Sequence, residues 1–259
     1  MLSRMSAQAR PQDLARLSLM TPAVLVPVDC AALSDIGRVR ARNEDSLAWD
    51  RDLGLFVLAD GIGGHRAGHI ASRLAVEAVL ASLRDAAPHD AARLERALAR
   101  AHSDIADAAL ANNDYDGMGT TLLAVALCGS TLQVAHVGDS RLYQLRDGQL
   151  ARLTRDHTVA EEWPGAGDDP RHRNQLTRAL GLGRQVMADH AAHPLRLGDR
   201  YLLCSDGLTA HLPDAELAAW MGAPLSADLR AHALIDLANQ RGGEDNASLI
   251  LFDVGHFDA

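Results

Sequence analysis

The sequence contains no lysine, and all 25 of its basic residues are arginines. A compositional bias toward arginine accounts for this more simply than any functional reason. The absence nevertheless excludes two kinds of chemistry. A chain without lysine has no P-loop lysine to bind nucleotide phosphates, and it has no lysine that could form a Schiff base with a carbonyl substrate.

Aromatic residues are also scarce, at 3% of the chain, whereas apolar residues make up 47%. That apolar fraction is typical of a globular protein with a buried core. The core is therefore expected to consist mainly of alanine, leucine and valine. Acidic residues outnumber basic ones by 34 to 25, so the net charge is −9. An acidic chain is a poor general binder of nucleic acids or anionic membranes, and neither partner is expected.

Cysteine is rare: the three cysteines are Cys30, Cys128 and Cys204, which are far apart in the chain. Their odd number and apolar surroundings favour buried free thiols in a reducing compartment, so a cytoplasmic location is expected. No run reaches the roughly 18 consecutive apolar residues of a membrane helix, and residues 1–22 lack the apolar core of a signal peptide. We expect a poorly ordered N-terminal tail over 1–22 and a single, monomeric domain over 23–259.

Hydrophobic periodicity and turn residues divide the rest of the chain into strands and helices. The predicted helices cover 67–84, 90–111, 213–221 and 226–240, and the predicted strands cover 23–32, 46–50, 55–59, 120–127, 132–137, 141–145, 150–153, 200–204 and 247–254. The polar segment 154–194 is expected to form loop and a short helix. This order lacks the strict strand–helix alternation of a doubly wound sheet. It predicts an α+β fold in which a central antiparallel β-sandwich is flanked on each side by a helix pair, giving four layers (α-β-β-α).

Acidic residues stand at the ends of several predicted strands. Asp60-Gly61 and Asp206-Gly207 each end an apolar run, while Asp45 and Asp245 each stand just before one. A carboxylate beside an apolar strand is costly to bury unless something compensates its charge. Several of them in one chain suggest a shared compensator, and divalent cations such as Mg²⁺ or Mn²⁺ suit oxygen ligands.

Each of these sites has a simpler explanation when it is taken alone. Asp-Gly after a strand is usually a turn, Asp139 could close a hairpin and pair with Arg141, and Asp245 could form a cap or an Asx-turn. The glycines at 61–64 do not fit a dinucleotide-binding fingerprint, because Arg66 stands where a third glycine is needed. Taken together, however, clustered carboxylates repel one another unless cations intervene.

No other reactive group is a good candidate. The histidines and cysteines lack zinc-ligand spacing, and no serine lies in a Gly-x-Ser-x-Gly turn. The remaining chemistry is metal-assisted hydrolysis at a two-metal centre, whose natural substrate is a phosphoester. Arg40, five residues before Asp45, could hold phosphate oxygens in its bidentate fork, although a surface arginine is the alternative.

Seven short motifs occur in order within residues 28–254. They are Ser34-Asp35-Ile36-Gly37 through Arg40-Ala41-Arg42-Asn43-Glu44-Asp45, Leu58-Ala59-Asp60-Gly61-Ile62-Gly63-Gly64-His65, Gly117-Met118-Gly119-Thr120-Thr121, Val137-Gly138-Asp139-Ser140-Arg141, Leu176-Thr177-Arg178-Ala179-Leu180-Gly181, Cys204-Ser205-Asp206-Gly207-Leu208-Thr209 and Gly243-Glu244-Asp245-Asn246. With these motifs the chain resembles the metal-dependent (type 2C, PPM) serine/threonine protein phosphatases in their compact bacterial form. Any one motif is weak, but the ordered set is specific.

The resemblance implies two core metal ions, Mn²⁺ or Mg²⁺, with Asp60 bridging them. Asp206 and Asp245 would complete the first site. Glu44, with the carbonyl of Gly61, would support the second.

The resemblance also implies roles around these ions. Asp139 with Asp206 would form a third, weaker metal site, and Asp45 would order metal-bound waters. Arg40 would hold the substrate phosphate, so that Arg40, Asp60 and Asp206 are the residues assigned to catalysis. The implied reaction is direct attack by a metal-activated water, without a phosphoenzyme.

The implied function is hydrolysis of phosphoserine and phosphothreonine in proteins, opposing a serine/threonine kinase. Two features depart from the family. Ile62 stands where animal members carry a proposed general acid, a role that we do not transfer to His65, and the 156–174 segment is shorter than the usual bacterial flap. Two alternatives stay open: a catalytically impaired binding module of this fold, which ought to lack a metal carboxylate, and a phosphatase of another phosphoester.

Overall fold

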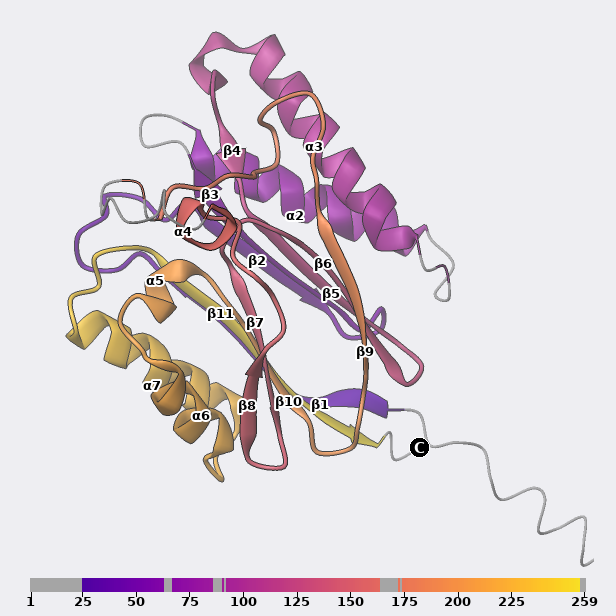
Figure 1. Cartoon of the computed structure of the whole chain (residues 1–259), viewed down its shortest axis with the longest axis vertical. Helices are drawn as coiled ribbons and strands as arrows, with labels where there is room; N and C mark the ends of the chain where they lie inside the picture. The colour runs from indigo at the N-terminus through magenta and orange to yellow at the C-terminus, as the bar shows by residue number, and fades with distance from the viewer. Residues whose placement is uncertain are drawn as a thin grey trace, which may run out of the picture.

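The computed structural model describes residues 25–62, 67–85, 90, 92–163, 172 and 174–256. Two antiparallel β-sheets face each other, and helices cover the outer face of each sheet (Figure 1). The expected α+β fold, a sandwich between two helical layers, is therefore confirmed. The predicted tail over 1–22 lies outside the described residues.

The first sheet has the strand order β1-β11-β10-β7-β8. Its strands are Leu25–Asp35 (β1), Ala247–His256 (β11), Arg200–Cys204 (β10), Arg141–Arg146 (β7) and Gln149–Arg152 (β8). The helices α5 (Asp206–Thr209), α6 (Asp214–Gly222) and α7 (Ala227–Gln240) lie on its outer side. The predicted N-cap of α7 is present, because the Ser226 hydroxyl accepts from the Leu229 N–H at 3.3 Å.

The second sheet has the strand order β2-β3-β5-β6-β9, and the short strand β4 pairs with the end of β3. Its strands are Asp45–Asp50 (β2), Leu55–Ile62 (β3), Leu122–Cys128 (β5), Thr131–Val137 (β6), Asp189–Pro194 (β9) and Gly119–Thr120 (β4). The helices α2 (Gly68–Arg84) and α3 (Arg93–Ala111) cover its outer face. Two short elements remain among the described residues, the 3₁₀ turn η1 (Asn113–Tyr115) and the helix α4 (Val159–Glu162).

The side chains of β3 illustrate how the core is built. Phe56 and Leu58 point between the two sheets, whereas the residues that alternate with them point toward α2 and α3. Because successive strand residues face opposite sides, one apolar run fills two layers. Alanine, leucine and valine dominate the buried residues, as the composition predicts. The few aromatics gather between the sheets, where the rings of Phe56 and Phe252 stack 4.1 Å apart.

The sequence does not predict β9. This strand lies within 154–194, for which loop and a short helix are expected; α4 is that helix, but the expectation is wrong for β9. Its sequence, Asp-His-Ala-Ala-His-Pro, has no apolar alternation, and five of its six residues are exposed. It is an edge strand held by backbone pairing with β6, from His136 opposite Asp189 to Thr131 opposite Pro194.

Two further expectations concern membranes and thiols. None of the described helices is both long and apolar enough to cross a membrane. The three cysteines, all within the described residues, form no disulfide. Only Cys204 is fully buried, and burial raises the pKa of its thiol to about 12.

Candidate active site

Asp60 lies near the end of β3, directly opposite Asp45 at the start of β2. Like charges directly across a strand pair destabilise a sheet. The backbone of Asp60 is held firmly all the same: its N–H donates to Thr121 Oγ1 (2.9 Å), and its carbonyl accepts from the Thr121 N–H (2.8 Å) and from Thr120 Oγ1 (2.8 Å). The fold therefore keeps two carboxylates face to face.

The facing sheet brings Asp206 and Asp245 to the same place. Asp206 follows β10 at the start of α5, and Asp245 precedes β11, the neighbour of β10. The two turns approach closely: a Cβ on Gly207 would lie 2.1 Å from the carbonyl oxygen of Asn246, so this position requires glycine. The carboxyl groups of Asp60 and Asp206 interact directly, so the predicted pair of strand-ending Asp-Gly turns meets from opposite sheets.

Burial and mutual repulsion govern the charge of this cluster. As a whole residue Asp60 is partly exposed, but its carboxyl group lies deep enough that burial raises its pKa well above the usual value. The carboxylates of Asp45, Asp206, Asp139 and Asp245 raise it further. Burial likewise raises the pKa of Asp45 to about 7. It raises the pKa of Asp139 to about 7 as well, with the charge of Asp206 adding to the effect.

The donor atoms of the cluster suit hard divalent cations. Asp45 Oδ1 and Asp206 Oδ1 are buried and lack a hydrogen-bond partner in the described part of the chain. An unpaired buried oxygen is costly, and carboxylate oxygens are ligands that Mg²⁺ and Mn²⁺ prefer. Among the described residues no three acidic, histidine or cysteine side chains converge as the ligands of one ion do. The carboxyl groups of the cluster instead contact one another in pairs, Asp45 with Asp60 and Asp60 with Asp206. To bind one shared ion, these side chains would have to turn toward it.

Glu44 reaches the same region from the loop before β2. Its carbonyl accepts from the Gly61 N–H (3.2 Å), and a Cβ on Gly68 would lie 2.9 Å from its Oε2 atom. A Cβ on Gly61 would in turn lie 2.4 Å from the Gly68 carbonyl. Glycines at both positions let the start of α2 lie against β3, and a Cβ on Gly68 would lie 2.9 Å from the Gly61 carbonyl oxygen as well as from the Glu44 carboxylate.

Arg40 lies on the loop between β1 and β2. Its NH2 atom is 2.6 Å from Asp245 Oδ2, and its side chain is 48% exposed. The charge of Arg40 also opposes the rise in the pKa of Asp206, which burial and the Asp245 carboxylate cause. The guanidinium therefore stands at the edge of the carboxylate cluster, where a ligand from solvent could replace its contact.

The loop that carries Arg40 is fixed by Asn246, whose role does not follow from the sequence. Its Oδ1 accepts from the Glu44 N–H (2.9 Å), and its Nδ2 donates to the carbonyls of Ile36 (2.9 Å) and Arg42 (3.0 Å). One buried amide thus joins the loop before β2 to the turn before β11. An asparagine after an acidic pair is too common a pattern to reveal this from sequence.

A cavity of about 980 Å³ opens beside these residues. Among its lining residues are Arg40, Glu44, Asp60, Gly61, Asp139, Asp206 and Asp245. Asp45 is the one candidate that does not line it, and its Oδ2 accepts from Ser205 Oγ at 2.9 Å. Ile62 also lines the cavity. His65 and most of the central part of the expected flap, residues 164–171 and 173, lie outside the described residues.

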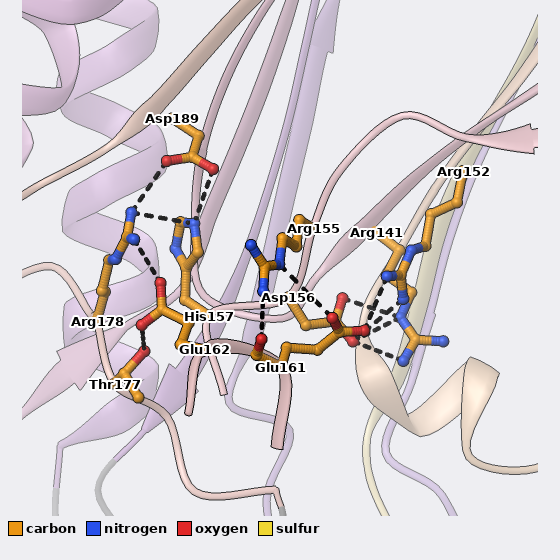
Figure 2. A network of polar contacts seen from close by, with 10 residues as sticks. All are labelled: Arg141, Arg152, Arg155, Asp156, His157, Glu161, Glu162, Thr177, Arg178 and Asp189. Carbon is orange, nitrogen blue, oxygen red and sulfur yellow. Dashed lines mark hydrogen bonds and ion pairs between the residues drawn. The ribbon is translucent and has the colours of Figure 1, made fainter. Parts of the chain in front are cut away.

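A second group of charged residues (Figure 2) reaches the cavity through Glu162 and Arg178. Arg141 contacts Asp156 through Nε (3.1 Å to each oxygen) and through NH2 (2.7 Å). Arg152 NH1 lies 3.5 Å from the same carboxylate. Arg141 therefore pairs with Asp156, whereas the simple hairpin turn considered from the sequence would pair it with Asp139.

His157 connects this network to the residue before Asp139. Its Nδ1 atom accepts from the Gly138 N–H (3.1 Å), and its backbone N–H donates to the Gly138 carbonyl (2.8 Å). Because Nδ1 accepts, the neutral ring carries its hydrogen on Nε2, which lies 3.2 Å from Asp189 Oδ2. The N–H and the carbonyl oxygen of Gly138 are therefore both hydrogen-bonded to His157, the first to its buried ring and the second to its backbone.

Arg178 completes the network and lines the cavity. Its guanidinium contacts the Glu162 carboxylate, and its NH1 atom lies 2.9 Å from Asp189 Oδ1. Each carboxylate in this group therefore has a cationic partner that the chain itself supplies.

Comparison with known proteins gives a consistent result. The family described as protein phosphatase 2C matches residues 38–239. The serine/threonine protein phosphatase PstP of Mycobacterium tuberculosis is 41% identical over 238 residues, which cover 88% of this chain and 45% of PstP. The serine/threonine phosphatase stp of Listeria innocua is 34% identical over 236 residues, which cover 85% of this chain and 93% of stp.

A solved structure is also similar, that of the catalytic domain of PstP in complex with two manganese ions. It has a TM-score of 0.81 and 40% sequence identity, and the match covers 89% of this chain and 99% of that one. The present chain spans less than half of the full length of the mycobacterial relative.

Proposed function

Because this chain belongs to the protein phosphatase 2C family, we propose that it hydrolyses phosphoserine and phosphothreonine in proteins at a centre of two Mn²⁺ or Mg²⁺ ions. The observation that carries the proposal is the group of carboxylates with raised pKa values beside the cavity, Asp60 above all. The two manganese ions of PstP support it. An impaired binding module ought to lack a metal carboxylate, and none of the expected ones is missing from the sequence.

Asp60, whose carboxyl group interacts with those of both Asp45 and Asp206, would be shared by the two ions. Asp206 and Asp245 would complete one site, and Glu44 with the carbonyl of Gly61 would complete the other. When bound, the ions supply positive charge for the phosphate and a nucleophilic water.

Two further acidic residues would support this centre. Asp139, which lines the cavity and whose pKa the charge of Asp206 raises, would hold a third, weaker ion together with Asp206. Asp45 would act from behind the ligands by orienting water, because it does not line the cavity and is already bonded to Ser205.

Arg40 would bind the phosphate of the substrate. A planar guanidinium can donate two parallel hydrogen bonds to phosphate oxygens. Its present contact with Asp245 is a half-exposed ion pair, and such pairs contribute little to stability. Arg40 can therefore turn to a phosphate at low cost, and this movement would free Asp245 for an ion.

We also propose the setting in which the protein acts. Phosphorylated proteins would be its substrates, and a serine/threonine kinase would add the groups that it removes. It would work as a monomer in the cytoplasm, with residues 23–259 as a single domain after the 1–22 tail. Size-exclusion chromatography with light scattering tests the oligomeric state directly.

The test of the activity is manganese-dependent hydrolysis of a phosphothreonine peptide and of an aryl phosphate. We expect no turnover after chelation, and none in Asp60→Asn or Asp206→Asn, whereas Asp104→Asn, an exposed carboxylate on α3, serves as the control with normal rates. Full activity of the chelated protein, or normal rates in both site variants, would overturn the proposal. Hydrolysis of the aryl phosphate without the peptide would instead favour another phosphoester as substrate.

A further inference from the structure

Apolar side chains as well as the carboxylates line the cavity. Three of the eleven exposed large hydrophobic side chains of the described residues line it, namely Trp163, Leu182 and Met187. Val186, which is partly buried against the helical core, lies beside them. We call Trp163, Leu182, Val186 and Met187 the apolar wall. Apolar side chains gathered at an open site mark a surface that another molecule covers.

Leu182 is placed by backbone contacts that lead directly to Asp60. Leu180 and Thr120 exchange backbone hydrogen bonds of 2.9 and 3.2 Å, and Thr120 Oγ1 donates to the Asp60 carbonyl at 2.8 Å. Leu182 also packs over β4, since a Cβ on Gly119 would lie 3.0 Å from its Cγ atom. The position of Leu182 relative to Asp60 is therefore fixed by the fold.

Gly181 adds to this rigidity. Its φ is +83°, and a Cβ there would lie 2.3 Å from Ile105 Cγ2, so only glycine fits the turn before Leu182. Its N–H donates to Nδ1 of His102 at 3.1 Å. The turn that presents Leu182 is thus held by α3 as well as by β4.

The other end of the wall is tied to the charged network of Figure 2. Arg178 NH1 donates to the Met187 carbonyl at 3.4 Å, while the same side chain contacts Glu162 and Asp189. The charged groups beside the wall are therefore paired with one another. A substrate charge placed here would have to compete with these pairs, whereas an apolar side chain would not.

We propose that the apolar wall binds a bulky apolar side chain next to the phosphorylated residue, so that the enzyme prefers phosphopeptides with leucine-like neighbours over acidic ones. This inference rests on the proposed function. When the phosphate of a peptide reaches the carboxylates, the residues next to the phosphorylated one lie against the lining of the cavity, which includes the apolar wall.

The test compares two phosphothreonine peptides that differ only in their flanking residues, leucine in one and glutamate in the other. A capped phosphothreonine without neighbours reports the basic reaction. With manganese present, we expect kcat/KM to be about 10-fold higher for the leucine peptide, the size of effect that one apolar contact gives. Equal values for the two peptides in the wild-type protein would overturn the inference.

Variants locate the preference on the wall. The double variant Leu182→Ser, Met187→Ser should reduce the preference to about 2-fold or less, and Leu182→Arg should reverse it in favour of the glutamate peptide. Leu110→Ser changes an exposed leucine on α3 that does not line the cavity and should retain the wild-type preference. The reversal cannot come from unfolding, which would lower both rates together.

Failure of the proposed function gives a different result. If the wild-type protein hydrolyses neither the peptides nor the capped phosphothreonine with manganese present, the proposed reaction is wrong. If it hydrolyses all three and the double variant keeps the full preference, only the role of the apolar wall is wrong. A change of oligomeric state in the double variant, seen by light scattering, would show that a second copy of this chain covers the wall and would likewise overturn the proposal.

Discussion

Two groups of carboxylates lie near one cavity, which Asp60 lines in one group and Glu162 in the other, and they differ in what compensates their charge. Asp156 and Glu162 lie in ion pairs with Arg141 and Arg178. Asp60 has instead four other carboxylates as its main electrostatic neighbours. In one group of carboxylates the arginines of the chain balance the negative charge. In the other group the carboxylates mainly face one another.

The difference separates structural charges from functional ones. Arginine can satisfy a buried carboxylate with several hydrogen bonds, and the resulting pair is a fixed part of the fold. A carboxylate group that the chain leaves without such a partner lowers stability unless an external cation supplies the charge. Asp156 and Asp60 should therefore respond in opposite ways to the same substitution.

The largest effect is expected for Asp60→Asn. The hydrolytic rate should fall by about 1,000-fold or more, because the proposed shared ligand is lost.

The metal-free Asp60→Asn variant should nevertheless be about 1 kcal/mol more stable than the metal-free wild type, so that its melting temperature is several degrees higher. The asparagine amide can donate to Asp45 Oδ1 and Asp206 Oδ1, which have no partner in the described part of the chain. Thermal melting in EDTA measures this effect, and a lower melting temperature would show that repulsion does not dominate the cluster.

The opposite result is expected for Asp156→Asn. This substitution leaves Arg141 and Arg152 without their shared partner and should cost about 3 kcal/mol, as removal of one member of a buried pair does. Urea denaturation measures the loss. The control is Asp104→Asn, whose partner Arg100 is exposed and for which about 0.5 kcal/mol or less is expected. Equal losses in the two variants would remove the distinction between the two groups of carboxylates.

Added manganese should stabilise the uncompensated group alone. At about 100 times its dissociation constant, an ion that binds only the folded state adds about 2.7 kcal/mol. The wild type and Asp156→Asn should both gain this stability, whereas Asp206→Asn should gain much less. Differential scanning calorimetry with and without manganese checks the difference, and an equal gain in all three proteins would contradict the assignment of Asp206.

Much of the fold follows from local patterns in the sequence. The predicted helix over 90–111 corresponds to α3, and the predicted strands over 141–145 and 150–153 correspond to β7 and β8. Each of these elements is identified without reference to the rest of the chain. The acidic ends of the strands likewise suggest a cation shared by Asp60 and Asp206, and the structure places these two residues at the ends of strands in facing sheets. β9 does not follow from the sequence, because an edge strand with exposed residues depends on backbone pairing and not on an apolar pattern.

The parts of the site that the sequence does not reveal depend on contacts between distant residues. Asn246 holds a loop about 200 residues away in the chain, and Ser205 bonds to Asp45 across the two sheets. Leu182 and Met187 lie in the polar 154–194 segment, where no periodicity marks them as neighbours. Their common position beside the cavity becomes visible only when the chain is folded.

The smallest effect is expected for Asp189→Asn, which tests whether His157 needs its carboxylate. The Asp189 carboxylate lies 3.2 Å from Nε2 of His157. It favours the tautomer of His157 that carries its hydrogen on Nε2, which leaves Nδ1 free to accept from the Gly138 N–H. An asparagine carbonyl can still accept from Nε2, but its amide cannot pair with Arg178 as a charge, so we expect a loss of about 0.5–1 kcal/mol in urea denaturation of the metal-free protein. Asp228→Asn is the matched control, because Asp228 also lies beside a histidine, His232 at 3.6 Å, but on an exposed helix surface. Its loss should be close to zero, and an equal loss in the two variants would mean that the paired network holds Gly138 without help from Asp189.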